Sequence, residues 1–218
     1  MSKQDYFGDW MKVIPEKELD AVMIKVARVR NDICPNFRDI FKAFKECPYN
    51  KLKLIILGQD PYPQEGVATG IAFANENTVQ ELSPSLNIIK ESVIDLNIPH
   101  NLITFAPDLL SWEKQGVLLL NSALTCIKNQ PGSHSLLCRP FMKKFIYNVS
   151  HDNPGTIFLL LGQQAWTYDE FISRDCVILK EHHPSYFARN NIQMPSEIWK
   201  DINKLIKYFE GVEIEFYT

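Results

Sequence analysis

The sequence of 218 residues has no excess of positive charge, few cysteines and no long apolar segment. Its formal net charge of −3 argues against a surface that is basic throughout, although a local basic patch remains compatible with that sum. No apolar run approaches the ~20 residues that a membrane helix requires. The N-terminal segment carries charged residues and shows no secretory signal. We therefore expect neither a membrane protein nor a generally basic nucleic-acid coat.

The five cysteines form no pattern that is typical of a disulfide framework or a clustered metal site. Their number is odd, and no two of them stand in a Cys-x-x-Cys pair. Reduced thiols in an intracellular compartment are the better interpretation, meaning the cytoplasm, or the nucleus or host cell for a eukaryotic or viral source. Low-complexity segments, internal repeats and Gly/Ser linkers are also absent, so we expect a single domain over residues 1–218.

Four short apolar runs predict the strands of a parallel sheet. Their apolar residues are consecutive rather than alternating, which is typical of strands covered on both faces. The runs are 52–57, 117–120, 156–161 and 176–179. Helical periodicity occurs over 20–29, 37–44, 85–93, 141–150 and 196–208. This alternation predicts an α/β fold in which helices flank a central four-stranded parallel sheet.

Polar residues follow each of the four apolar runs. They are Gly58-Gln59-Asp60-Pro61-Tyr62, Asn121-Ser122, Gly162-Gln163-Gln164 and, after two charged residues, His182-His183-Pro184-Ser185. The carboxyl ends of parallel strands lie at one edge of a sheet, and ligands bind at that edge. One pocket is therefore expected to collect an Asp, an Asn, a His and an aromatic ring.

Structural explanations compete with this interpretation at two of these positions. Asp60 alone fits a turn or a helix cap. Pro61 and Pro63, however, stiffen the chain on both sides of Tyr62, which favours a site that holds a water and a ligand in register. Asn121 fits a strand-end Asx turn, and equally an amide that offers a planar ligand one donor and one acceptor.

The same competition applies to the histidines and to Phe73. A lone histidine is more often structural, and we assign His182, His134, His151 and His100 to that class. His183 differs because Pro184 follows it at the expected ligand-binding edge. Phe73, in the segment 70–73, fits core packing as well as a ring that stacks on a base.

These segments resemble the family 1 uracil-DNA glycosylases. The stretch 'GQDPY' (58–62) is similar to their water-activating motif, 'GVLLLNSALT' (116–125) to their uracil-reading strand, and 'HPS' (183–185) to the start of their His-Pro-Ser-Pro-Leu loop. Four further stretches stand in the family's order: 'DIFKAF' (39–44), 'GIAFA' (70–74), 'SPSL' (83–86) and 'FLLLG' (158–162). The resemblance covers roughly residues 10–190 and implies the same four-stranded fold.

The resemblance implies base excision repair by a monofunctional N-glycosylase that needs no metal and no organic cofactor. Such an enzyme flips deoxyuridine out of single- or double-stranded DNA and hydrolyses its N-glycosidic bond. By position, Asp60 would orient the attacking water and stabilise the cationic sugar. His183 would donate a hydrogen bond to uracil O2, joined by the backbone at Gln59.

Base selectivity would follow from three residues of the same pocket. Asn121 would pair with uracil N3–H and O4, a pattern that cytosine reverses. Tyr62 would press against C5 and leave no room for the methyl group of thymine. Phe73 would stack on the face of the base.

DNA contacts would come from loops at the same edge. A wedge after His183 would enter the base stack, and we expect Phe187 rather than Tyr186 to be that wedge. Phosphates would be held by Ser83, Pro84, Ser85, Gly162, Gln163 and Ser185. The resemblance also implies a monomer, and it admits a protein inhibitor that mimics DNA as a partner.

Three positions depart from the family pattern. Pro63 replaces the usual His, Gln163 replaces a Ser that touches phosphate, and Tyr186-Phe187 replaces Pro-Leu. The basic segment after the wedge is reduced to Arg189. We therefore expect either weaker DNA affinity or the need for a partner.

Two other classes of protein compete with this assignment. A catalytically silent DNA-binding protein on the same scaffold is disfavoured because Asp60, Asn121 and His183 are all retained. An α/β hydrolase or nucleotide-binding domain would need a Gly-x-Ser-x-Gly elbow or a phosphate loop, and neither occurs. The cysteine spacing disfavours the iron–sulfur type of uracil glycosylase.

Overall fold

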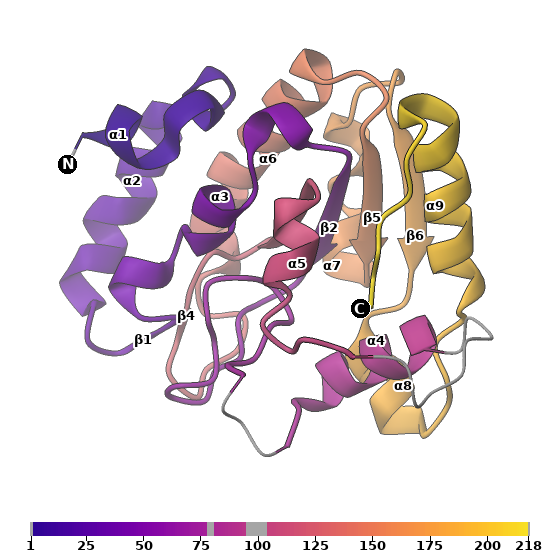
Figure 1. Ribbon diagram of the computed structural model, residues 1–218. Coiled ribbons are helices and arrows are strands. Elements are labelled where there is room, and N and C mark those ends of the chain that lie inside the picture. The colour runs from indigo at the N-terminus through magenta and orange to yellow at the C-terminus, as the bar shows by residue number, and fades with distance from the viewer. Residues whose placement is uncertain (1, 78–80, 95–103, 218) are drawn as a thin grey trace.

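A four-stranded parallel sheet forms the centre of the computed structural model, which describes residues 2–77, 81–94 and 104–217 (Figure 1). The strands are β2 (Leu54–Gly58), β3 (Val117–Asn121), β5 (Ile157–Leu161) and β6 (Val177–Glu181). They are ordered β3-β2-β5-β6, and each neighbouring pair is parallel. The sheet predicted from the four apolar runs is therefore confirmed.

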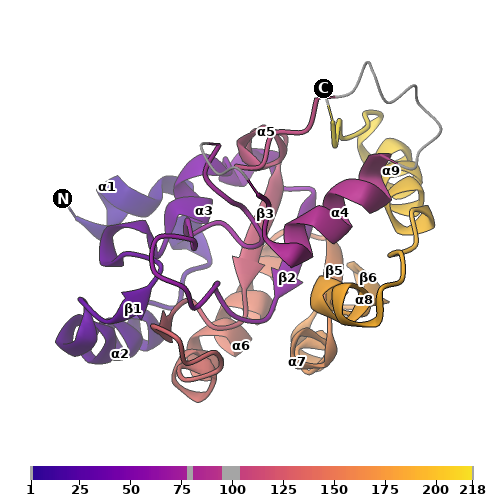
Figure 2. The same ribbon diagram turned by 90° about the horizontal axis from the view of Figure 1, so that it is seen from below.

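The strands are buried as their composition requires. Every residue of β2 and β5, the two inner strands, is buried, because each carries apolar side chains on both faces. Helices α6 (Ser135–Asp152) and α7 (Gln163–Trp166) cover one face, and α5 (Leu110–Lys114) and α9 (Glu197–Glu210) cover the other (Figure 2). Trp112 of α5 and Trp199 of α9 pack edge to face, with ring centroids 5.6 Å apart.

The remaining elements include several that the sequence did not predict. Helices α2 (Glu16–Val26), α3 (Lys42–Glu46) and α4 (Pro84–Ile94) overlap the segments expected over 20–29, 37–44 and 85–93. Helices α1 (Lys3–Phe7) and α8 (Pro184–Asn190) were not expected. Strands β1 (Ile33–Cys34) and β4 (Cys126–Ile127) pair as an antiparallel ribbon. Short 3₁₀ turns occupy Gly8–Lys12, Ala27–Val29, Phe37–Asp39, Tyr49–Lys51 and Asp169–Phe171. The short elements carry too few residues for a period to be visible.

The carboxyl ends of the strands point toward the side of the molecule where α4 and α8 pack together (Figures 1 and 2). These two helices begin directly at the loops that were expected to bind DNA. Across the described ranges, no helix combines the length and apolar character needed to cross a bilayer.

Candidate active site

A cavity of about 380 Å³ opens at the carboxyl ends of the strands. It is lined by residues from three of the four segments expected to meet there, which are far apart in the sequence, whereas no residue of 162–164 lines it. Of the predicted site residues, the lining includes Gln59, Asp60, Tyr62, Phe73, Ser85, Asn121, His183 and Ser185. The geometric expectation that an acid, an amide, an imidazole and an aromatic ring share one pocket therefore agrees with the structure.

Asn121 and Phe73 converge on the backbone of Gly58 at the end of β2. A Cβ placed on Gly58 would lie 2.6 Å from Asn121 Oδ1 and 2.7 Å from Phe73 Cζ, so no larger residue fits there. Gly58 and Asn121 are also register partners across β2 and β3. The amide makes no hydrogen bond with the residues that the structure describes, which leaves both of its polar atoms for a ligand.

Phe73 and Tyr62 form the aromatic part of the wall. Phe73 adopts a left-handed backbone conformation with φ +67°, which is strained for an aromatic residue. The Tyr62 hydroxyl donates to the Phe73 carbonyl oxygen at 2.9 Å. Burial raises the pKa of Tyr62 to about 12, so its hydroxyl remains a neutral donor and the ring is fixed at the cavity edge.

Asp60 is held by the segment that leads into α6. Ser135 Oγ donates to Asp60 Oδ1 at 3.2 Å, and the backbone N–H of Gly132 donates to the same carboxylate. Burial raises the pKa of Asp60 above its ordinary value, while the hydrogen bonds from Ser135, Gly132 and Gln59 oppose that shift. One oxygen is thus fixed, and the group remains available as a base or as an anion facing a developing cation.

Two thiols support the loop that follows Asp60. Cys34 Sγ lies 3.4 Å from the Pro63 carbonyl oxygen, and Cys126 Sγ lies 3.6 Å from that of Pro61. Both cysteines are buried in the β1–β4 ribbon, where they are register partners. The rigidity expected from Pro61 and Pro63 is therefore reinforced from outside the loop.

His183 caps α8 and is neutral. Its Nδ1 accepts the Ser185 backbone N–H at 3.2 Å and lies 2.9 Å from Ser185 Oγ, so the neutral ring carries its proton on Nε2. Burial, together with the charge of Arg189, lowers the pKa of His183 to about 4. The Phe73 and His183 ring centroids are 5.6 Å apart. An N–H donor is thus placed beside the aromatic wall.

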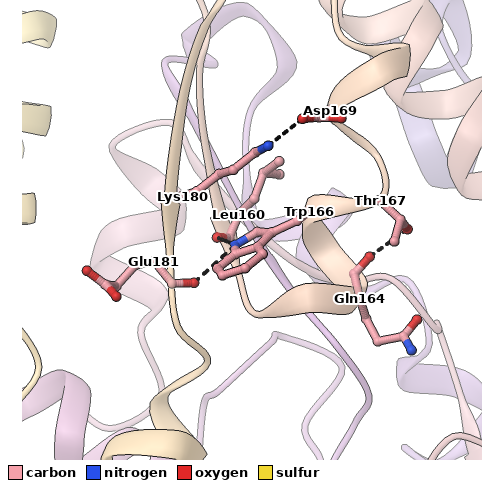
Figure 3. Close-up of polar contacts among 7 residues, drawn as sticks. All are labelled: Leu160, Gln164, Trp166, Thr167, Asp169, Lys180 and Glu181. Atoms are coloured by element: carbon pink, nitrogen blue, oxygen red, sulfur yellow. Dashed lines mark hydrogen bonds and ion pairs between the residues drawn. The ribbon is translucent and has the colours of Figure 1, made fainter.

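The loop after β5 packs closely against His183 at Gly162. A Cβ on Gly162, whose φ is +89°, would lie 2.8 Å from His183 Cβ. Figure 3 shows the hydrogen bonds that join α7 to the ends of β5 and β6: Trp166 Nε1 donates to the carbonyl oxygens of Leu160 at 3.1 Å and Glu181 at 3.2 Å. Residues from the ends of β5 and β6 therefore hold the Gly162 turn against His183.

The residues predicted to hold phosphates lie in different settings. Pro84 and Gln163 are exposed, and Ser85 is buried against the cavity. The hydroxyl of Ser83 is already engaged, because it donates to Asn75 Oδ1 at 2.7 Å and contacts Tyr62. Ser83 therefore supports the aromatic wall rather than presenting a free hydroxyl.

The wedge expected after His183 differs from the side chain that the structure presents. Phe187 is 4% exposed and packs in the core, whereas Tyr186 is 38% exposed. The reason is helix α8, in which Pro184 and Phe187 share the buried side and Tyr186 points outward. Tyr186 stacks on His182 with ring centroids 4.4 Å apart. The ring available to DNA in this structure is therefore Tyr186.

Sequence reasoning missed two residues of the site. Ser135 was not considered, and Arg189 was noted for its charge alone although it lines the cavity. A Pro at the first position of α8, after a histidine cap, is a helix-start signal that would have placed Arg189 one turn beyond Ser185. Within the described residues, no cluster of His, Cys, Asp or Glu is arranged to hold a metal ion.

The chain is similar to known proteins over most of its length. A family model described as the uracil DNA glycosylase superfamily matches residues 44–207. A uracil-DNA glycosylase from Campylobacter jejuni is 42% identical over 187 residues, which cover 84% of this chain and 79% of that protein. One from Fusobacterium nucleatum is 32% identical over 219 residues, covering 96% of this chain and 95% of that protein.

Solved structures agree with the sequence comparisons about the fold. The crystal structure of mimivirus uracil-DNA glycosylase matches with a TM-score of 0.74 at 21% identity, covering 97% of this chain and 90% of that chain. A variant of the mimivirus protein in complex with UGI matches with a TM-score of 0.78 at 22% identity, covering 99% and 88%.

Proposed function

The chain belongs to the uracil-DNA glycosylase superfamily, and we propose that its cavity receives a uracil flipped out of DNA and hydrolyses the bond to deoxyribose. The observation that carries this proposal is the convergence of Asp60, Asn121, Phe73 and His183 on one cavity of about 380 Å³. Extruding the base is necessary because no side chain reaches the glycosidic bond inside a duplex.

Hydrolysis begins as the bond between C1′ and uracil N1 lengthens and its electron pair moves onto the base. His183 Nε2–H donates to uracil O2 as negative charge develops there, a contribution of about 10²–10³ in rate. Because the imidazole is neutral, with its pKa lowered to about 4, it stabilises the anion without transferring its proton. Uracil leaves as the anion and takes its proton from solvent.

Asp60 acts on the sugar side. Its carboxylate faces the positive charge that develops at C1′ and orients a water whose oxygen forms the new bond to that carbon. The proton released by the water passes to the carboxylate and then to solvent. A positioned base of this kind contributes about 10²–10⁴ in rate. Ser135 and Gly132 hold the carboxylate while it does so.

The walls select the base. Asn121 accepts from uracil N3–H and donates to O4, and cytosine would leave buried groups unpaired, a mismatch that rejects a ligand by about 10⁴. Phe73 stacks on the base, worth about 1–3 kcal/mol. Tyr62, tied to the Phe73 carbonyl, blocks the position of a 5-methyl group.

DNA is held around the cavity by the first turns of α4, α7 and α8. We assign phosphate contacts to Ser85, Ser185, Pro84, Gly162 and Gln163, and the wedge to Tyr186 because Phe187 is buried. We further propose a single domain that acts as a monomer in a reducing compartment. An inhibitor that mimics DNA would cover the same surface, as UGI binds the mimivirus relative.

The test is uracil release by the purified chain. A uracil-containing oligonucleotide, single- or double-stranded, is incubated with the protein in chelator, and alkali-labile abasic sites are measured. We expect cleavage at uracil and none in a matched thymine oligonucleotide. Asp60→Asn and His183→Ala should lose about 10²-fold or more while unfolding at the wild-type temperature. Absence of product from every substrate would contradict the proposal.

A further inference from the structure

A carboxyl group that the proposed reaction does not use is enclosed beside strand β3. Glu113 of α5 is fully buried, and its Oε1 accepts the backbone N–H of Leu119 at 3.1 Å. Its Oε2 has no hydrogen-bond partner among the described residues, and none of the ion pairs found there includes Glu113. A buried carboxylate without a partner is far less stable than a buried neutral carboxyl. The surroundings of Glu113 therefore favour its protonated form.

The titratable groups around Glu113 do not stabilise a charge on it. Burial raises the pKa of Glu113 well above its ordinary value, and the charge of Glu46 on α3, which packs against α5, acts in the same direction. The backbone N–H from β3 and the Cys47 thiol oppose this shift without cancelling it. Lys53, which precedes β2, acts on the Cys47 thiol, and Lys114, the next residue of α5, is exposed. No cation of the described residues therefore compensates a charge on this carboxyl.

The peptide groups of Leu119 connect the carboxyl to the base pocket. Leu119 lies on β3, an edge strand of the sheet; its N–H donates to Glu113, and its carbonyl oxygen accepts the Ala72 N–H at 3.1 Å. Asn121 follows two residues later on β3, and Phe73 directly follows Ala72. The two side chains assigned to the base therefore extend from segments that meet at one anchored residue.

We propose that Glu113 is a positioning residue of the base pocket, whose neutral carboxyl anchors the edge strand so that Asn121 and Phe73 keep their places. The positioning role rests on the proposed function, whereas the neutral state of the carboxyl does not. Asp60 and His183 are not attached to this anchor, because they come from the loop after β2 and from the start of α8. The role therefore predicts weaker binding of the base with no change in the acid limb of the pH–rate profile.

The pH dependence of unfolding tests the charge state. In the unfolded chain the carboxyl ionises near its ordinary pKa of about 4.3, whereas the folded chain keeps the proton to higher pH, so stability falls as pH rises between the two values. The unfolding constant of wild type divided by that of Glu113→Gln should therefore rise about tenfold per pH unit above about pH 5, and level off where the folded carboxyl ionises. A ratio that does not change with pH would overturn the inference.

NMR of wild type labelled with ¹³C at its glutamate carboxyls checks the charge state directly. At about pH 6, one resonance that Glu113→Gln lacks should have the chemical shift of a protonated carboxyl. Ionised shifts for every glutamate would equally overturn the inference.

Inhibition by free uracil, together with KM for a uracil oligonucleotide, tests the positioning role. Glu113→Gln keeps an oxygen for the Leu119 N–H, so both constants should stay within about twofold of wild type. Glu113→Met fills a similar volume without an acceptor and should raise both about tenfold. Ser92→Ala is the matched control: it removes the acceptor of another buried N–H, that of the Trp199 indole, and neither of these residues lines the cavity. It should lower stability and leave both constants unchanged.

Two results would overturn the positioning role. One is a folded Glu113→Met with the wild-type constants, and the other is an equal rise in the Gln and Met variants. Glu113→Leu replaces the methionine variant if that variant does not fold. Both results leave the proposed function intact while wild type releases uracil. A wild type that releases none fails at the earlier proposal, and its unfolding still reports the charge state.

Discussion

Replacing Ser135 by alanine should move the acid limb of the pH–rate profile to higher pH. Ser135 Oγ donates to Asp60 Oδ1 at 3.2 Å, and this hydrogen bond favours the ionised carboxylate. The proposed chemistry needs the ionised form. Removing a hydrogen bond to the charged form raises the pKa of Asp60 further, so protonation stops the reaction at a higher pH than in wild type.

The size of the effect follows from the contact. A hydrogen bond to a charged group is worth about 1.5–3 kcal/mol, and one pKa unit corresponds to about 1.4 kcal/mol. The 3.2 Å separation is long for such a bond, Asp60 is partly exposed, and the Gly132 and Gln59 donors remain. We therefore expect the lower end of that range, a shift of about one pKa unit. We also expect a rate loss of about tenfold at neutral pH because the carboxylate is less well oriented.

Single-turnover release of uracil, measured from about pH 4 to pH 8, tests this expectation. Ser135→Thr keeps a hydroxyl and should restore both the rate and the wild-type limb. Ser133→Ala is the control, because its hydroxyl accepts the Ile127 N–H at 2.8 Å and does not touch Asp60. If folded Ser135→Ala shows the acid limb of the wild type, Ser135 does not hold Asp60 in the reacting complex.

Two further substitutions separate the base pocket from the DNA surface. Asn121→Asp replaces an N–H donor by an acceptor that suits the amino group of cytosine. Uracil release should therefore fall by about 10², while abasic sites appear at cytosine. A variant that still rejects cytosine entirely would contradict the role of the amide. Tyr186→Ala should lower activity on duplex DNA about tenfold, spare single strands and leave the unfolding temperature unchanged. Phe187→Ala should instead lower the free energy of unfolding by about 3–5 kcal/mol in chemical denaturation, because Phe187 is buried. If Phe187→Ala lost activity on duplex DNA alone while Tyr186→Ala lost stability, Phe187 would be the wedge.

The sheet and the residues at its carboxyl edge could be predicted because two simple regularities apply to them. Strands buried on both faces have consecutive apolar residues, as in β2 and β5. Parallel strands bring their carboxyl ends together, so the order of strands and polar residues alone predicts that Asp60, Asn121 and His183 share one cavity, as they do. The motif resemblance then supplied the reaction, which the geometry alone leaves open.

The rest of the site depends on contacts that leave no local pattern. Ser135 and Asp60 are 75 residues apart, and the sequence around either residue contains no motif that predicts the hydrogen bond between them. The inward orientation of Phe187 follows from α8, a helix of 7 residues that is too short to show a period. Aligning Phe187 with the leucine of the family motif therefore identified the position in the chain without the direction of the side chain.

Two of the three departures from the family pattern lie on the DNA surface, whereas Pro63 lines the cavity, and the residues assigned to the base itself keep the pattern for a physical reason. The base contacts come from strand ends, where Gly58 cannot enlarge without striking Asn121 and Phe73. The DNA contacts come from short helices, where an exposed side chain such as Tyr186 or Gln163 changes without disturbing the core. Substitutions on this surface can therefore replace one contact to DNA by another without loss of the fold, as Gln163 in place of the serine of the family pattern illustrates. Affinity for DNA and selectivity for uracil should therefore respond to separate sets of substitutions.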